Sequence, residues 1–310
     1  MNTVLITGAS SGFGEAVAQY FMNAGWNVIA TMRDTGAATH RSNALPNLLI
    51  TRLDVQDRPT IEAAIAEGIR RFGGIDVVVN NAGYGLFGIF EGVSREAIQA
   101  QFDVNVFGAM DVVRAILPHF RAKRSGTIVN VSSGAGVVGF PMASIYSASK
   151  FALEGWSEGL SYELDSLGIK VKIIEPGGAT KTNFMARVGG EGDGQQPIDD
   201  YSQFLNHIGQ VYAGMASLAD PDAIGKVVAA IFTAATDGSR QLRYSPTDDI
   251  QPILNARRST SEREYRSVTL EDGGVGDVLG PLAVLAAFTA MFAGMALWRF
   301  KADAPKRTWG

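Results

Sequence analysis

The first 24 residues place the strongest constraint on the fold. They hold a short apolar run, Val4 to Thr7, then the glycines Gly8, Gly12 and Gly14, and then a helical pattern from Ala16 to Ala24. A strand that turns through glycines into a helix forms an anion site, because glycines let the backbone approach a pyrophosphate and the free N–H groups of the first turn point at it. The segment therefore predicts a nucleotide-binding unit at the start of an α/β domain.

A second segment, 130–154, brings together Ser133, Tyr146 and Lys150, three side chains suited to proton transfer at a carbonyl. Lys150 follows Tyr146 by four residues, so the two share one face of a helix. An ammonium there favours the phenolate and is expected to lower the tyrosine pKa toward working pH. Ser133 follows the apolar run Thr127–Val131, which predicts a place at the carboxyl end of a strand, where open parallel sheets bind ligands. The Tyr-x-x-x-Lys pair alone is a weak signal, and the glycine-rich N-terminus strengthens it.

Several short segments occur in a characteristic order: TGASSGFG at 7–14, LDV at 53–55, NNAG at 80–83, DVNVFG around Asn105, Ser133, YSASK at 146–150 and PGG at 176–178. In this order they resemble the short-chain dehydrogenase/reductase family, in the branch of hydroxysteroid and carbonyl reductases. The resemblance covers roughly residues 1–265. It implies an α/β fold with a doubly wound, Rossmann-type parallel sheet in a single domain, which we assign to 1–270.

The resemblance also implies roles for four residues. Tyr146 is the general acid in carbonyl reduction, Lys150 tunes it and holds the nicotinamide ribose, and Ser133 orients the carbonyl oxygen. Asn105 lies in a largely apolar helical pattern, where asparagine is unfavourable. The family's reason is a water held there as a proton relay, and the alternative is a buried amide that ties two helices together.

Apolar periodicity predicts the elements of this domain. The expected strands are Val4–Thr7, Asn27–Met32, Leu48–Leu53, Asp76–Val79, Thr127–Val131, Val171–Glu175 and Gln241–Ser245. The expected helices are 14–24, 60–72, 96–119, 143–167 and 221–235.

The second expected strand indicates the cofactor. An enzyme built for NAD usually ends this strand with a carboxylate that accepts from the ribose 2′-OH. Here Met32 and then Arg33 stand at that point. A guanidinium suits a 2′-phosphate, so the sequence favours NADP(H). NAD(H) stays possible, with Asp34 as the ribose partner and Arg33 merely solvated.

The family pattern implies the remaining cofactor contacts. They are Gly8, Ser10, Ser11, Gly12, Phe13, Gly14, Arg33, Asp54, Val55, Asn81, Ala82, Gly83, Tyr146, Lys150, Pro176, Gly177, Thr180 and Thr182. One threonine of the last pair is expected to serve, and the spacing does not decide which. Asp54 is expected to accept from the adenine amino group.

Composition excludes several other classes of function. The formal net charge of −4 gives no electrostatic footprint for nucleic acid. The absence of cysteine excludes disulfides and thiol catalysis. His40, His119 and His207 have no acidic partner at metal spacing, so no metal site is expected. The start MNTVLITG leads directly into a strand and shows no N-terminal signal peptide.

The C-terminal part departs from the family pattern. Residues 278–298 contain 21 residues without a charge, which is the length of a membrane-spanning helix. We therefore expect a linker at 271–277, a transmembrane helix at 278–298 and a basic tail at 299–310. Small residues at 286, 290 and 294 could pack on another membrane helix. The alternative is a soluble apolar helix in an oligomer interface. The catalytic domain is expected to face the cytoplasm, where the cofactor is, although the basic tail favours the opposite orientation.

Substrate and partners are less constrained. Extra apolar positions on the helix from 143, among them Phe151 and Trp156, favour a homo-oligomer. The residues expected to face the pocket are apolar, which suits a lipid-like carbonyl; they are Tyr84, Leu86, Phe140, Met142 and Phe184. The alternative function is a membrane-anchored nucleotide-binding subunit for assembly or sensing that no longer turns over.

Overall fold

A computed structural model describes residues 1–36, 45–178, 198–217, 220–263 and 265. The described chain divides into two compact units, each considered by itself. The first comprises 1–199 and 218–251, and the second comprises 200–217 and the residues from 252 onward.

The first unit is built on a parallel sheet of seven strands in the order β3-β2-β1-β4-β5-β6-β7. The strands are β1 (Thr3–Ile6), β2 (Asn27–Met32), β3 (Leu48–Arg52), β4 (Val77–Asn80), β5 (Gly126–Val131), β6 (Ile169–Ile174) and β7 (Arg243–Tyr244). Each neighbouring pair is parallel. The predicted α/β fold with a doubly wound parallel sheet is therefore confirmed, and its strands lie within about two residues of the expected ranges.

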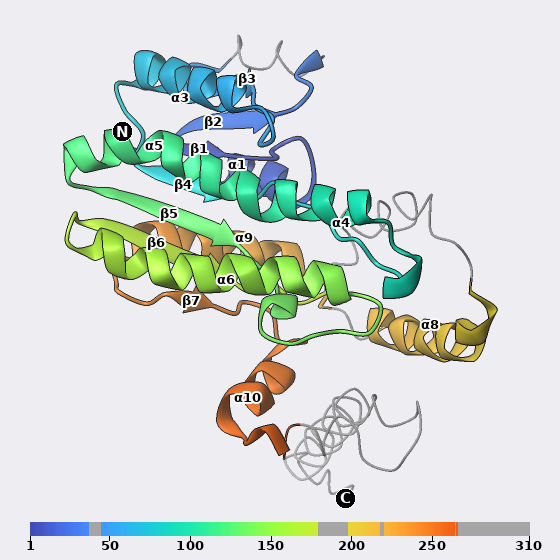
Figure 1. Ribbon diagram of the computed structural model, residues 1–310. Helices are drawn as coiled ribbons and strands as arrows, with labels where there is room; N and C mark the ends of the chain where they lie inside the picture. Colours follow the sequence, from blue (N-terminus) through green and yellow to red (C-terminus); the bar gives the residue numbers. More distant parts are fainter. Residues whose placement is uncertain (37–44, 179–197, 218–219, 264, 266–310) are drawn as a thin grey trace, which may run out of the picture. The chain divides into compact units, whose positions relative to one another are not determined.

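Helices cover both faces of this sheet (Figure 1). The helices α3 (Arg58–Phe72), α5 (Ala109–Lys123) and α6 (Ser144–Asp165) lie on one face, and α1 (Gly12–Asn23) and α9 (Ala223–Thr236) lie on the other. The central strands β1, β2 and β4 are buried along their whole length and are largely apolar, as expected for parallel strands covered on both faces. Leu5 of β1 packs in the core beneath α3 and α5, whereas Val4 and Ile6 pack in the core beneath α1 and α9.

The predicted helix 96–119 is interrupted. The chain forms α4 (Arg95–Phe102), then a π-helical turn over Asp103–Gly108, and only then α5. Such π turns are rare and occur mostly at functional sites. Asn105 lies inside the turn, so the asparagine that is unfavourable in an α-helix marks the point where regular helix geometry stops.

The second unit contains α8 (Ser202–Ser217) and most of α10 (Gln251–Ser259).

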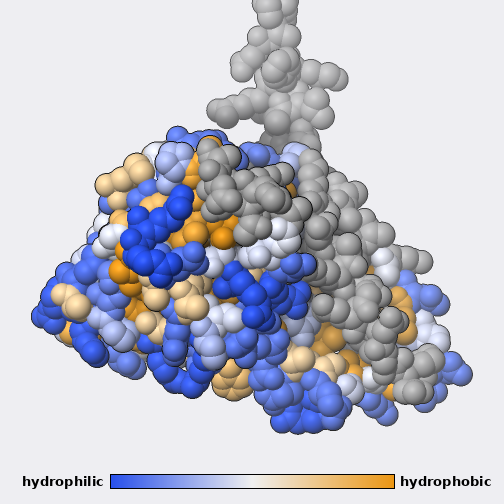
Figure 2. Space-filling view, turned by 90° about the horizontal axis from the view of Figure 1, so that it is seen from above, coloured by the Kyte–Doolittle hydropathy of each residue, from blue (hydrophilic) through white to orange (hydrophobic). Residues whose placement is uncertain are grey.

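On the face shown in Figure 2, hydrophilic residues predominate and hydrophobic ones form small patches. Among the apolar residues of α6, Phe151 is exposed, as a contact face would require, whereas Leu153, Leu160 and Leu164 are buried in the first unit. The homo-oligomer stays a prediction.

The predicted membrane location is contradicted. Within the described ranges no helix is both long and apolar enough to cross a bilayer. The longest of them, α6, has 22 residues but carries Lys150, Glu154 and Glu158, whose charges are costly in hydrocarbon. The predicted helix 278–298 lies outside the described residues, as do the linker and the tail, so the structure gives an appended apolar helix no support.

We expect Gly155→Ala to stabilise the protein. Gly155 is exposed in the interior of α6, and a Cβ built there would have no described atom within 4 Å. Alanine removes the entropy cost of a helical glycine, so the free energy of unfolding should rise by about 0.5–1 kcal/mol in urea denaturation. Gly14→Ala is the matched control in α1, because its Cβ would lie 2.2 Å from Gly8 O, and it should destabilise. A loss of stability in Gly155→Ala would contradict this packing.

Candidate active site

The site lies where the order of strands reverses. The chain passes from β1 outward to β2 and β3 and returns to β4 on the other side of β1. Ligands of open α/β sheets bind at such a switch point, beyond the carboxyl ends of the strands. Asn81, which follows β4, donates from Nδ2 to Thr7 O (3.0 Å) and Gly8 O (3.2 Å), and the Thr7 hydroxyl accepts from the backbone N–H groups of Asn81 and Ala82. These bonds hold the glycine turn against the end of β4.

The glycine turn has the geometry of a phosphate cradle. Gly8 has a positive φ of 67°, and a Cβ there would lie 2.9 Å from Ala82 Cα. A Cβ on Gly14 would strike Gly8 O. Among the described residues no side chain caps the first turn of α1, since the hydroxyl of its N-cap residue Ser11 makes no capping bond. The first N–H groups of α1 therefore suit a nucleotide diphosphate.

The ends of β2 and β3 lie beside this turn. Ala9 N donates to Thr31 O (2.9 Å), which places the turn next to the end of β2. Arg33 is exposed just beyond β2 and makes no hydrogen bond or ion pair within the described chain. Asp34 Oδ1 instead accepts from Gly36 N (2.9 Å). Asp54 lies after β3, and its Oδ1 accepts from Gln56 N (3.1 Å).

The three proposed catalytic side chains converge where α6 meets the end of β5. Tyr146 and Lys150 lie one turn apart on α6, and both are buried. The Lys150 ammonium donates to Val131 O (2.9 Å) and lies 5.8 Å from the centre of the Tyr146 ring. The Ser133 hydroxyl is hydrogen bonded to Tyr146 and accepts from Ala135 N (3.1 Å). The structure thus brings together the three residues that the sequence placed in one short segment.

The electrostatics of Tyr146 differ from the prediction. Burial raises the pKa of the Tyr146 phenol to about 12, and the bond from Ser133 offsets this only in part. Burial also lowers the pKa of Lys150 to about 8, while the nearby Glu154 acts to raise it. The expected lowering of the tyrosine pKa is therefore absent, because desolvation of the phenolate outweighs the neighbouring groups. The phenol stays protonated near neutral pH and is available as a proton donor.

Asn105 connects the π turn to its surroundings. Its Oδ1 accepts from Tyr84 N (3.1 Å), and its Nδ2 donates to Tyr84 O (2.9 Å) and Ser149 Oγ (3.2 Å). A Cβ on Gly83 would lie 3.0 Å from Asn105 Oδ1 and 3.8 Å from Lys150 Nζ, so Asn105 lies close to the lysine. The amide ties the loop after β4 to α6. The relay water implied by the family resemblance stays a prediction.

The other predicted contact residues are placed as follows. Pro176 O accepts from Gly134 N (2.8 Å), which ties the loop after β6 to the end of β5, and Gly177 N donates to Thr247 Oγ1 (2.8 Å), which ties it to the segment after β7. Ser10 is exposed, Phe13 packs beside the core, and Val55 is buried. Thr180, Thr182 and Phe184 lie outside the described residues.

Sequence reasoning missed two residues that shape the site. Phe87 stacks on Tyr146, with ring centres 5.7 Å apart, and packs with Phe140 beside Ala135 and Ala143. Gln101 is fully buried, where its amide accepts from Leu86 N (2.6 Å) and donates to Tyr84 O (2.8 Å). Gln101 precedes Asn105 by four residues, and a second polar residue at that spacing was the available signal.

Histidine and acidic residues form no metal site in the part of the chain that is described: no group of three or more His, Asp or Glu could hold an ion there. His119 lies far along α5, where its Nε2 accepts from Ile75 N (3.1 Å).

Comparisons with known proteins agree with this geometry. Residues 2–191 match the family model for short chain dehydrogenases. The mouse 17-beta-hydroxysteroid dehydrogenase type 1 is 33% identical over 266 residues, which cover 82% of this chain and 76% of that protein.

Two solved structures of similar fold contain a nicotinamide cofactor. A short-chain dehydrogenase/reductase from Burkholderia phymatum in complex with NAD has a TM-score of 0.70 at 25% identity, covering 83% of this chain and 92% of that chain. ElxO with NADP bound has a TM-score of 0.63 at 25% identity, covering 79% and 97%. The seven-stranded parallel sheet, the glycine turn, the meeting of Ser133, Tyr146 and Lys150, and the family match together show that this chain belongs to the short-chain dehydrogenase/reductase family of oxidoreductases.

Proposed function

We propose that this protein is an NADP(H)-preferring oxidoreductase that interconverts a ketone or aldehyde with an alcohol on an apolar substrate, with Tyr146 as the acid and base. One observation carries the proposal. The buried Tyr146 phenol lies close to both Ser133 and Lys150, where α6 meets the carboxyl end of β5.

In the reduction, Tyr146 donates its phenolic proton to the carbonyl oxygen. A nicotinamide cofactor, when bound, would supply the hydride for the carbonyl carbon, so that the products would be an alcohol and the oxidised cofactor. Ser133 orients the carbonyl oxygen toward Tyr146, since its hydroxyl is already hydrogen bonded to the phenol. The alcohol gives its proton back to the phenolate when the reaction runs in reverse.

Lys150 acts on the same proton. Its ammonium favours the phenolate that forms when Tyr146 has given up its proton, and it would hold the nicotinamide ribose. With a pKa of about 8 it is mostly charged near neutral pH. Asn105, which lies beside Gly83 and Lys150, would hold a water that helps to return a proton to Tyr146.

The surroundings of Tyr146 support an apolar substrate. Phe87 stacks on its ring, and Phe140 packs beside it. Such a wall favours a substrate whose carbonyl or alcohol is attached to an apolar body. The relative named as a hydroxysteroid dehydrogenase is consistent with this class of substrate.

Arg33 is the basis for the preference for NADP(H). It is exposed at the end of β2, next to the glycine turn, and its guanidinium is unpaired within the described chain. Asp34 uses one carboxylate oxygen on Gly36 N, so it is less available to a ribose hydroxyl. The alternative of a nucleotide-binding subunit without turnover is not favoured, because such a protein has no need to keep Ser133, Tyr146 and Lys150 together.

Tyr146→Phe tests the acid. The substitution removes the phenolic proton and keeps the ring on Phe87, so turnover should fall by about 10²–10⁴-fold. Binding of NADPH, measured by fluorescence, should change little. Turnover would be measured with a ketosteroid, retinal and nitrobenzaldehyde as substrates, from the loss of NADPH absorbance.

The matched control is Tyr162→Phe. Tyr162 lies on the same helix but is 74% exposed, so this variant should retain wild-type turnover. Retained activity in Tyr146→Phe would remove Tyr146 from the mechanism, and failure of the wild-type protein to reduce any carbonyl would favour the subunit without turnover.

Arg33→Ala tests the cofactor preference. Loss of a charge-assisted contact with the 2′-phosphate should weaken NADPH binding by about 1–3 kcal/mol and leave NADH binding nearly unchanged, as measured by calorimetry. Arg52→Ala is the control, because Arg52 ends the neighbouring strand opposite Met32 and is paired with Asp57 at 3.6 Å. Equal weakening of the two cofactors in Arg33→Ala would show that this arginine does not bind the 2′-phosphate.

A further inference from the structure

The face of α6 that carries the active-site residues continues one turn further. Tyr146, Lys150 and Glu154 are spaced by four residues, and their exposed fractions are 7%, 6% and 5%. Side chains at this spacing lie above one another on a helix. A buried carboxylate therefore follows the buried ammonium on the same side of α6.

The end of β5 runs along this face. Val131 O accepts from Lys150, and Ser132, the next residue, faces Glu154. A Cβ on Gly136 would lie 2.6 Å from Ser132 Oγ, 2.9 Å from Glu154 Cγ and 3.2 Å from Lys150 O. Gly136 thus lies against both residues of the helix, and the packing leaves no room for a larger side chain between α6 and β5.

The two oxygens of Glu154 have different surroundings. Oε2 accepts from Arg243 Nε at 3.0 Å. Oε1 is buried and, like Ser132 Oγ, has no hydrogen-bond partner among the residues that the structure describes. The Ser132 hydroxyl is nevertheless near enough to lower the pKa of Glu154. A buried carboxylate oxygen without a hydrogen bond destabilises the folded protein, so its presence indicates a functional role.

Arg243 is shared by three carboxylates. Besides Glu154, it contacts Glu158 of α6 at 2.5 Å and Glu175, which follows β6 and is fully buried, at 3.5 Å. Glu175 and Arg243 are the charged groups that act on Glu154 from other elements of the described chain, and Tyr146 and Glu154 are those nearest Lys150. Three negative charges against one positive charge leave this cluster with an excess of negative charge behind Lys150.

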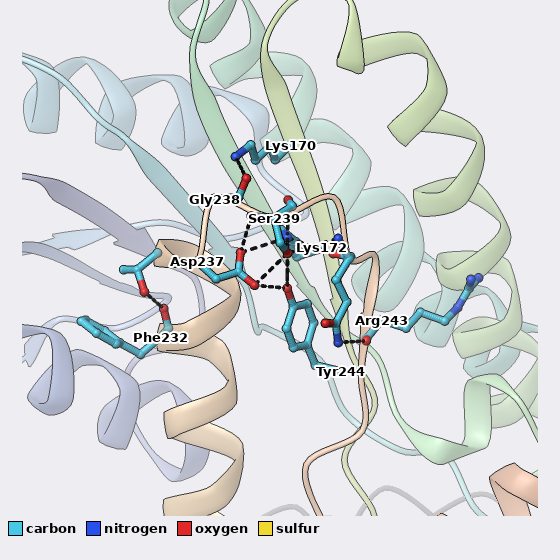
Figure 3. Close-up of polar contacts among 10 residues, drawn as sticks. Lys170, Lys172, Phe232, Asp237, Gly238, Ser239, Arg243 and Tyr244 are labelled. Carbon is cyan, nitrogen blue, oxygen red and sulfur yellow. Dashed lines mark hydrogen bonds and ion pairs between the residues drawn. The ribbon is translucent and has the colours of Figure 1, made fainter.

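Arg243 is held rigidly in this position. It belongs to β7, and the next residue, Tyr244, is fixed by the buried ammonium of Lys172, which donates to Tyr244 OH at 3.0 Å. Lys172 also bonds Asp237 Oδ1 and the Ser239 hydroxyl (Figure 3). In Figure 3 the Arg243 side chain extends away from this cluster, and its partners on that side are the carboxylates of α6.

We infer that Glu154 is a positioning residue for Lys150: its buried carboxylate, which is bound by Arg243, maintains the active-site lysine in its charged form. The inference rests on the proposed function, in which the Lys150 ammonium stabilises the Tyr146 phenolate.

The electrostatics have the required sign. Burial lowers the pKa of Lys150, and Glu154 is the group that raises it again. Burial and the charge of Glu175 raise the pKa of Glu154, and the contacts with Ser132 and Arg243 offset this rise only in part. Removing the carboxylate should therefore let Lys150 lose its proton at a lower pH.

The test is the titration of Lys150 in Glu154→Gln. In protein labelled with ¹³C-lysine, the Cε chemical shift of Lys150, assigned with Lys150→Arg, reports its charge directly and needs no substrate. The midpoint should fall by about half to one pH unit in Glu154→Gln. It should stay near the wild-type value in Glu154→Asp, which keeps the charge.

Glu158→Gln is the matched control. Glu158 lies one turn further along α6 and binds the same arginine, but it is 42% exposed and does not act on Lys150. Its loss should leave the midpoint unchanged. An unchanged midpoint in Glu154→Gln, or an equal fall in Glu158→Gln, overturns the inference.

Arg243→Gln is the second variant, should Glu154→Gln fail to fold. Without the Arg243 guanidinium, Glu154 should take up a proton, so the Lys150 midpoint should again fall. An unchanged midpoint again overturns the inference.

The reduction rate of nitrobenzaldehyde separates this inference from the proposed function. The rate falls at alkaline pH as Lys150 loses its proton, and this fall should begin at a lower pH in Glu154→Gln than in the wild-type protein. If the Lys150 midpoint falls and the rate profile does not move, the role of Glu154 stands and the role of Lys150 in the proposed reaction is wrong.

Discussion

The hydrogen bond from the Lys150 ammonium to Val131 O is the contact on which the active site depends. A buried ammonium without an acceptor is costly, so this bond fixes how α6 lies along the end of β5. Once Lys150 is fixed, helix geometry places Tyr146 one turn before it, against Ser133, and Glu154 one turn after it, against Ser132. One contact thus sets the position of the proposed acid, of the serine proposed to orient the substrate and of the buried carboxylate.

A second set of contacts joins this half of the site to the nucleotide half. Asn81 bonds the glycine turn after β1, and Gly83, two residues later, lies between Asn105 and Lys150. The loop after β4 therefore lies against both the glycine turn and Lys150. Because β1 and β4 are the strands at which the order reverses, the topology of the sheet explains why these two halves meet.

The sequence predicted those parts of the site that depend on local spacing. The strand, glycine turn and helix at the start, and the positions of Ser133, Tyr146 and Lys150, follow from periods of two and about four residues. Contacts between distant segments were not accessible in this way. The bond from Arg243 to Glu154 joins residues 89 apart, and no local pattern pairs them. The expected low pKa of Tyr146 failed for a related reason, since it considered one neighbour and not the burial of the phenol by residues from other elements.

The edge of the sheet at β7 shows how a very short strand can hold a charged side chain in place. This strand has two residues, paired as Ile173 with Arg243 and Ile174 with Tyr244, which is little backbone pairing for an edge. Successive side chains point to opposite faces. Tyr244 bonds the buried Lys172 on one face, and Arg243 binds the carboxylates of α6 and Glu175 on the other. Each face thus pairs a buried charge with a group of opposite charge, since Lys172 also contacts Asp237. Because neither charge can leave its partner without being left unpaired in the interior, the two faces hold β7 in position together. The guanidinium that binds Glu154 is therefore fixed by ionic contacts on the far side of the sheet and not by its own strand pairing alone.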